Sequence, residues 1–239
     1  MLLFMELADK KVDFMCLDTP DSQVHCRDIL LGKTYPLVPY AKDVKVIVDI
    51  GANLGAASVF FSLNYPEARV YSLEPQKFPF EILTRNTSFY PNAKVFNTGL
   101  FDSDRESPLY LSWVDNATAS IGSSWLNTEK TETIKLRDAA GWAQEQGITS
   151  IDILKIDTEG CEIPVLSRLA PLIPRTQVIY VEYHSDTDRR ALDDLIGESH
   201  VLFSAKAVRA HVGELVYVRA DLGGSDSDLH KHRIKLPQF

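Results

Sequence analysis

Short apolar segments alternate with helical patterns along most of the chain. Mostly apolar runs rich in β-branched residues predict strands over residues 44–49, 68–73, 94–97, 109–113, 133–136, 151–157, 177–184, 201–205 and 214–219. Apolar residues at helical spacing predict helices over residues 56–64, 77–90, 138–146 and 191–196, and another after Gly160. Strands alternating with helices in this way indicate an α/β fold, a mostly parallel sheet with helices on both faces.

The two ends of the chain follow a different pattern. Residues 12–17 alternate between apolar and polar positions, and a segment punctuated by prolines follows up to Pro39. The chain from Gly223 onward is polar. We therefore predict an N-terminal extension over residues 1–42 that packs on the core, one domain over residues 43–222, and a C-terminal tail over residues 223–239.

Composition narrows the class of protein further. The chain has 239 residues, 45% of them hydrophobic, which excludes a largely disordered chain. The net charge of −8 argues against a nucleic-acid partner. The sequence contains neither a run of apolar residues long enough to span a membrane nor a signal-peptide pattern. Three cysteines without metal-binding spacing indicate neither disulfides nor zinc, so we expect a cytoplasmic protein.

A glycine-containing turn follows the strand predicted over residues 44–49. Gly51 and Gly55 would let a nucleotide approach the backbone, although an ordinary tight turn uses glycine too. Asn53 stands where a dinucleotide-binding turn has its second glycine. The carboxylate of Asp49 suits a sulfonium or ammonium group better than a pyrophosphate. Glu74 ends the next strand, where an acid can hold ribose hydroxyls, and together these features favour S-adenosylmethionine over NAD.

A second group of polar residues ends two later strands. Lys155 and Asp157 share one face of a strand, and Glu182 and His184 share one face of another. If the strands are neighbours, these four side chains meet at the carboxyl edge of the sheet. Lys155 and Glu182 would then neutralise each other, whereas Asp157 and His184 are candidates for function. With Glu159 this group offers ligands for Mg²⁺ or Mn²⁺, but we favour a metal-free acid–base cluster.

Several strings in the sequence resemble the FkbM family of S-adenosylmethionine-dependent methyltransferases. They are Asp49-Ile50-Gly51-Ala52-Asn53-Leu54-Gly55, Leu73-Glu74-Pro75, Asn86, Thr98-Gly99-Leu100 and Leu154-Lys155-Ile156-Asp157-Thr158-Glu159-Gly160-Cys161-Glu162. The resemblance covers about residues 43–184. It implies the class I methyltransferase fold, a Rossmann-like, seven-stranded, mostly parallel sheet with an antiparallel last strand. It also implies, in most cases, O-methylation of a sugar, a glycolipid or another natural product.

The same resemblance implies roles for individual residues. Four residues of the turn would hold the methionine end of the cofactor: Asp49, Gly51, Asn53 and Gly55. Glu74 would bind the ribose, and Gly99 and Leu100 would lie near the adenine. Three residues would face the methyl group and the acceptor: Asp157, Glu159 and His184. Asp157 would belong to the cofactor site as well. We expect acceptor selectivity to reside in residues 102–130.

The sequence therefore predicts an S-adenosylmethionine-dependent O-methyltransferase that acts on a small-molecule or glycan acceptor. His184 is the predicted base that removes the hydroxyl proton. Two alternatives remain at this stage. One is a non-catalytic module that keeps the fold and binds a nucleotide or a partner. The other is an NAD(P)-dependent dehydrogenase, which Asn53 and the spacing of the glycines disfavour.

Overall fold

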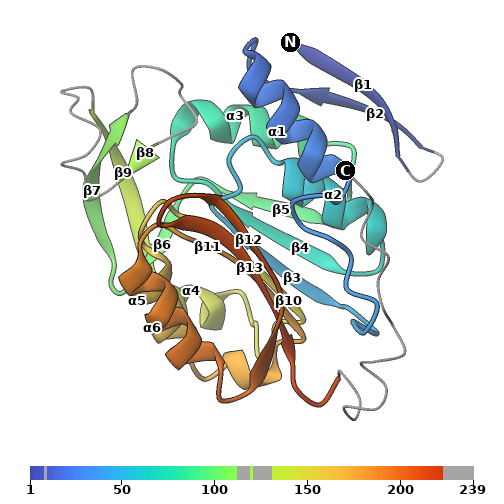
Figure 1. Ribbon diagram of the computed structural model, residues 1–239. Helices are drawn as coiled ribbons and strands as arrows, with labels where there is room; N and C mark the ends of the chain where they lie inside the picture. The colour runs from blue at the N-terminus through green and yellow to red at the C-terminus, as the bar shows by residue number, and fades with distance from the viewer. Residues whose placement is uncertain (8–9, 112–118, 121–130, 223–239) are drawn as a thin grey trace.

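The computed structural model describes residues 1–7, 10–111, 119–120 and 131–222 (Figure 1). Its main feature is a seven-stranded sheet with the strand order β12-β13-β11-β10-β3-β4-β5. The strands are β3 (Val46–Ile50), β4 (Arg69–Leu73), β5 (Ala93–Phe96), β10 (Ile153–Ile156), β11 (Val178–Tyr183), β12 (His200–Arg209) and β13 (Val212–Arg219). The expected tail, residues 223–239, lies outside the described residues.

The strand directions confirm the predicted sheet. Strands β5, β4, β3, β10 and β11 run parallel to one another. The last strand, β13, runs antiparallel to both of its neighbours and lies between β11 and β12. The final hairpin therefore places β12, rather than the last strand, at the edge of the sheet. Parallel strands bring their carboxyl ends to one edge, where ligands bind in open α/β sheets.

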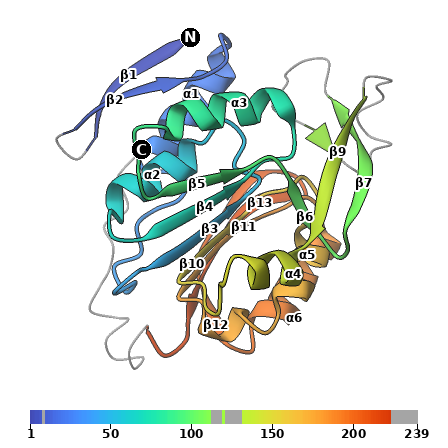
Figure 2. The ribbon, with the colours of Figure 1, turned by 180° about the vertical axis from the view of Figure 1, so that it is seen from behind.

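Helices cover both faces of this sheet, as the alternation of strands and helices predicted. On one face lie α1 (Pro20–Leu30), α2 (Ala56–Asn64) and α3 (Lys77–Thr87), and on the other α4 (Ala139–Glu145), α5 (Glu162–Leu169) and α6 (Asp186–Ile196) (Figures 1 and 2). A short 3₁₀ helix, η1 (Ile173–Arg175), precedes β11. The apolar stripes of the two helix layers pack in two separate hydrophobic clusters. None of the described helices is both long and apolar enough to cross a bilayer.

A smaller sheet stands beside the main one and has the strand order β6-β9-β7-β8. Its strands are β6 (Gly99–Phe101), β7 (Arg105–Leu111), β8 (Ala119–Ser120) and β9 (Thr131–Asp138). The buried side chains of Leu109, Ile134 and Leu136 form its core. Of the segment expected to select the acceptor, residues 112–118 and 121–130 lie outside the described residues.

The N-terminal segment forms a hairpin and a helix. Strands β1 (Leu2–Leu7) and β2 (Lys10–Met15) pair antiparallel, and α1 follows. The sequence pattern predicted no helix here, yet Thr19 caps α1 by accepting the backbone N–H of Ser22 at 3.3 Å, and Pro20 occupies its first turn. Ile29 of α1 packs in the same cluster as Phe61 of α2. Residues of α1 and residues at the carboxyl ends of β10 and β11 line one cavity, so the N-terminal segment lies beside that edge of the sheet.

Candidate functional site

The turn after β3 explains why glycine is needed at two positions. Gly51 has a φ of +76°, and a Cβ atom there would lie 1.8 Å from the backbone oxygen of Asp157. Gly55 has a φ of +89°, and a Cβ atom there would lie 2.7 Å from a methyl carbon of Leu83. The turns after β3 and β10 therefore touch through their backbones. This close approach brings Asn53 next to Asp157 at the carboxyl edge of the sheet.

Asp49 and Lys155 form a buried ion pair beneath this turn. The carboxylate of Asp49, fully buried, lies 3.2 Å from Nζ of Lys155 and accepts a hydrogen bond of 2.7 Å from Ser58 Oγ. Lys155 also donates to the carbonyl oxygen of Gly51 at 2.7 Å. Its second ion-pair partner is Asp157 at 3.9 Å. Asp49 lines neither of the two cavities described below, and its carboxylate instead contacts Lys155 and Ser58 beneath the turn.

The pairing expected between Lys155 and Glu182 is wrong, and the register of the strands gives the reason. Lys155 lies directly beside Asp49 of β3 on one side and beside Tyr180 of β11 on the other. Glu182 lies two residues further along β11, at the level of the strand ends. The charge of Lys155 is therefore met by Asp49 and Asp157, and Glu182 needs another partner.

A narrow cavity of about 90 Å³ opens between the turn after β3 and the small sheet. Glu74 lies at its wall and accepts the backbone N–H groups of Asn53 at 2.9 Å and of Gln76 at 2.8 Å. Burial raises the pKa of Glu74 to about 7, although these two hydrogen bonds act in the opposite direction. Gly99 and Leu100 also line this cavity, as do apolar side chains of β7 and β9. We call it the small cavity.

A second cavity of about 430 Å³ lies between α1 and the carboxyl ends of β10 and β11. We call it the α1 cavity. Gly51, Asn53, Asp157 and Glu159 line both cavities, so the two meet at the turns after β3 and β10. Its volume falls in the range of about 300–1,000 Å³ that is usual for small-molecule sites, whereas the small cavity lies below that range.

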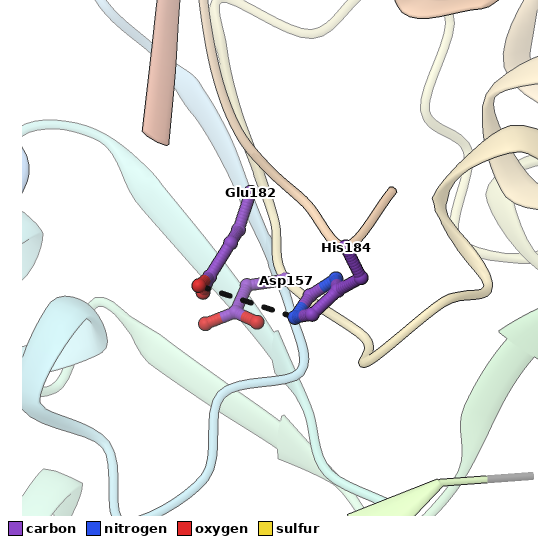
Figure 3. Close-up of side chains that lie close together, drawn as sticks. All are labelled: Asp157, Glu182 and His184. Carbon is purple, nitrogen blue, oxygen red and sulfur yellow. Dashed lines mark ion pairs between the residues drawn. The ribbon is translucent and has the colours of Figure 1, made fainter. Parts of the chain in front are cut away.

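His184 lies in a group of carboxylates rather than on a cavity wall. Its Nε2 atom is 3.1 Å from Glu159, and its Nδ1 atom is 3.5 Å from Glu162. Figure 3 shows His184 with Asp157 and with Glu182, whose carboxylate lies 3.9 Å from Nε2. Burial acts to lower the pKa of His184, but hydrogen bonds to Glu159 and Glu162 outweigh it and raise the pKa to about 11.

This electrostatic environment argues against the predicted role of His184 as the base. An imidazole that carries a proton at neutral pH cannot accept another. His184 also lines neither the small cavity nor the α1 cavity. Its positive charge instead holds the carboxylates around it in place. The pKa of Glu182 is raised by burial and by the nearby charge of Asp157, with His184 acting in the opposite direction. Glu182 and Asp157, unlike His184, both line the α1 cavity.

Three residues of this group could hold a metal ion. Asp157, Glu182 and His184 each offer one ligand atom, and these atoms lie within 4.8 Å of one another (Figure 3). To bind a metal, His184 would have to lose the ring proton that Glu159 and Glu162 stabilise on it. The metal-free cluster that we favour from the sequence therefore stays our prediction.

Sequence reasoning missed the contribution of the N-terminal segment to this site. Ser22, His25, Cys26 and Ile29 of α1 line the α1 cavity, and Tyr35 lines it as well. From the sequence alone, His25 was an isolated histidine with no partner at ligand spacing. The signal that could have found the helix is the capping pair Thr19-Pro20, followed by Ser22, Cys26 and Ile29 at helical spacing.

The strand order and the ligand edge define a class I methyltransferase fold. A solved structure with this fold, the precorrin-6y C5,15-methyltransferase of Geobacter metallireducens, superposes with a TM-score of 0.50 at 14% sequence identity. The match covers 87% of this chain and 94% of the other. Within this class the chain belongs to one family: the sequence model described as "Methyltransferase FkbM domain" matches residues 49–218. The predicted resemblance is thereby confirmed: the chain belongs to the FkbM methyltransferase family.

Curated relatives are similar to more than half of this chain. The hexuronic acid methyltransferase AglP of Haloferax volcanii is 25% identical over 68% of this chain and 66% of its own length. The 2-O-methyltransferase NoeI of Sinorhizobium fredii is 24% identical over 58% of this chain and 63% of its own length. The 31-O-demethyl-FK506 methyltransferase FkbM of Streptomyces tacrolimicus is 26% identical over 64% of this chain and 68% of its own length. The chain thus spans less than two thirds of the length of the first two.

Proposed function

We propose that this methyltransferase transfers the methyl group of S-adenosylmethionine to a hydroxyl oxygen of a sugar or another natural product. The observation that carries the proposal is the junction of the two cavities at Gly51, Asn53, Asp157 and Glu159. A cofactor bound on one side of this junction and an acceptor on the other would meet there. Relatives that act on hexuronic acid and on an oxygen of FK506 support an oxygen acceptor.

The residues of the small cavity fit the cofactor. Glu74 has a buried carboxylate at the end of β4, suited to ribose hydroxyls. Leu100 and Leu136 offer apolar surface for adenine. A Cβ atom on Gly99 would lie 2.7 Å from Leu136, so this part of the cavity wall has no room for a side chain at residue 99. Because the cavity measures only about 90 Å³, the apolar side chains must move apart to admit the nucleoside. Gly51 and Asn53 would then hold the methionine end.

When bound, S-adenosylmethionine would supply a methyl group on a sulfonium: as the acceptor oxygen bonds to the methyl carbon, the carbon–sulfur bond would break and release S-adenosylhomocysteine. The residues of this chain orient the hydroxyl and take its proton. Asp157 faces both cavities and is the residue we propose to accept that proton. Glu182, whose pKa is raised by burial, can share it. Lys155 fixes the carboxylate of Asp157 from below at 3.9 Å.

A thermal-shift comparison tests the cofactor. We expect S-adenosylhomocysteine to raise the melting temperature, and NAD and NADP to leave it unchanged. At a hundredfold excess over the dissociation constant, mass action stabilises the folded state by about 2.7 kcal/mol. Stabilisation by NAD or NADP alone would support the dehydrogenase alternative. Stabilisation by S-adenosylhomocysteine without any methyl transfer would support the non-catalytic module.

A further inference from the structure

The α1 cavity has two walls of different character. Aromatic and apolar side chains form one part, in which the ring of Tyr35 is fixed by Phe61 and by an edge contact with Tyr180 at 5.6 Å between ring centroids. Polar side chains form the other part, where the strand ends contribute carboxylates. An aromatic ring held in place in the same cavity as hydrogen-bond acceptors suits a sugar, which has apolar ring faces and hydroxyl edges.

The charges on the cavity wall are mostly negative. Asp21, Asp157, Glu159 and Glu182 all line it. Burial and the charge of Asp157 raise the pKa of Glu182 to about 9, so the other three carboxylates carry the negative charge at neutral pH. Each ionised carboxylate accepts hydrogen bonds from hydroxyl groups and repels another anion. At a cavity partly shielded from water, such repulsion is stronger than it would be at an open surface.

The cationic groups on the wall do not offset this charge for a ligand. Lys155 donates hydrogen bonds to the carbonyl oxygens of Gly51 at 2.7 Å and Ile50 at 3.4 Å. Its ammonium also forms ion pairs with Asp49 at 3.2 Å and Asp157 at 3.9 Å, so groups of this chain already balance its charge. His25 is the other basic residue among the described lining residues. Burial lowers the pKa of His25, and the positive charges of Lys155 and Lys206 lower it further. The negative charges of Asp157 and Asp28 act in the opposite direction but do not outweigh the burial. Its imidazole is therefore neutral at neutral pH.

We infer that the α1 cavity is the acceptor site and that it takes an uncharged, hydroxyl-rich molecule of sugar size rather than an acidic sugar. This inference rests on the proposed function, because the acceptor must reach a methyl group held at the shared residues. It makes the N-terminal helix α1 the element that determines which acceptor binds. The acceptor of this chain would then differ in charge from hexuronic acid, named for the methyltransferase to which the chain is similar.

Matched glycosides test the charge preference. The probes are the methyl glycosides of glucose, galactose and mannose, each paired with the methyl glycoside of its uronic acid. Saturation-transfer NMR on protein loaded with S-adenosylhomocysteine measures their binding. We expect at least one neutral glycoside to bind, and its uronate partner to bind at least about tenfold more weakly, because a carboxylate meets the acidic wall. Equal or tighter binding of the uronate, or no binding by any neutral glycoside, would overturn the inference.

Two substitutions on α1 test the location. His25→Trp fills the cavity, whereas Val24→Trp adds the same ring at a neighbouring residue that is 56% exposed and does not line the cavity. His25→Trp should weaken glycoside binding by about tenfold or more and leave the affinity for S-adenosylhomocysteine unchanged. Val24→Trp should change neither. Unaltered glycoside binding in His25→Trp would contradict the location. If wild-type protein fails to bind S-adenosylhomocysteine, the proposed function fails instead.

Discussion

Lys155 carries its charge inside the sheet, where an isolated ammonium is strongly disfavoured. Burial acts to lower the pKa of Lys155, but the charges of Asp49 and Asp157 outweigh it and raise the pKa, so the lysine stays protonated. The pair with Asp49 is buried on both sides, with side chains 4% and 0% exposed. Removing one partner would leave the other as an unpaired charge in the core.

We expect Lys155→Met to destabilise the protein by about 3–5 kcal/mol, because the carboxylate of Asp49 loses its counter-ion. Adding Asp49→Asn should recover most of that loss. Urea denaturation of both variants measures the free energy of unfolding. Lys206→Met is the control, since Lys206 is 62% exposed in its pair with Glu214 and should cost about 0–1 kcal/mol. If Lys155→Met alone is as stable as Lys206→Met, the buried pair of Lys155 and Asp49 does not contribute to stability as described.

The raised pKa of His184 makes a prediction about stability and pH. The folded-state pKa of about 11 lies above the ordinary value of 6.5. The contribution of His184 is therefore fully present below about pH 6.5 and is lost as the pH rises toward about 11. The cost of His184→Gln in free energy of unfolding should be largest near pH 6 and should shrink by about pH 9.

His211→Asn serves as the control for this pH series. Its imidazole pairs with Asp186 at 2.7 Å, but its side chain is 69% exposed, so the pair should contribute only about 0–1 kcal/mol at either pH. A cost of His184→Gln that stays constant with pH, or increases, would show that His184 is neutral in the folded protein. The predicted role of His184 as the base would then be open again.

At the scale of elements, the contact between the turns after β3 and β10 determines where the cavities meet. Gly51→Ala should cost about 3 kcal/mol or more, since the new methyl group would lie 1.8 Å from the backbone oxygen of Asp157. Gly147→Ala is the matched control: its φ is +68°, but nothing lies within 4 Å of the added carbon. It should cost only about 1–2 kcal/mol, the strain of a left-handed residue. Equal costs by urea denaturation would contradict the close approach.

The elements that the sequence predicted well are those in which local pattern and burial agree. Helix α2 begins and ends at the predicted residues, 56–64, because apolar side chains run through it and the residue before it is glycine. Helix α1 was missed because its face toward the core is narrow, with Cys26, Ile29 and Leu30 buried among exposed polar residues. Its stability comes from packing against α2, which a local pattern does not reveal.

The candidate site could be predicted in part for the same reason. Adjacent strands β10 and β11 bring Asp157, Glu182 and His184 together, as the alternation of side chains indicated. The sequence could not reveal the strand register that pairs Lys155 with Asp49, or the protonation of His184. Both depend on which carboxylates tertiary folding gathers around each group, including Glu162 from the start of α5.

At the scale of the whole molecule, the two cavities meet at one pair of turns, those after β3 and β10. Residues of the small sheet line the small cavity, and residues of the N-terminal helix line the α1 cavity. The core sheet thus supplies the shared residues, and the added segments supply the outer walls. We propose that in this arrangement the family fold holds the methyl donor and that α1 selects what receives the methyl group.

Our central proposal is that this protein moves a methyl group from S-adenosylmethionine to a hydroxyl oxygen of the acceptor, and that Asp157 takes the hydroxyl proton. The most direct measurement incubates the protein with methyl-labelled S-adenosylmethionine and the neutral methyl glycosides, and locates the label by mass spectrometry and NMR. We expect a labelled methyl ether, formed about 10²–10⁴ times more slowly by Asp157→Asn at unchanged affinity for S-adenosylhomocysteine. Label on nitrogen, no labelled glycoside, or an undiminished rate in Asp157→Asn would contradict the account.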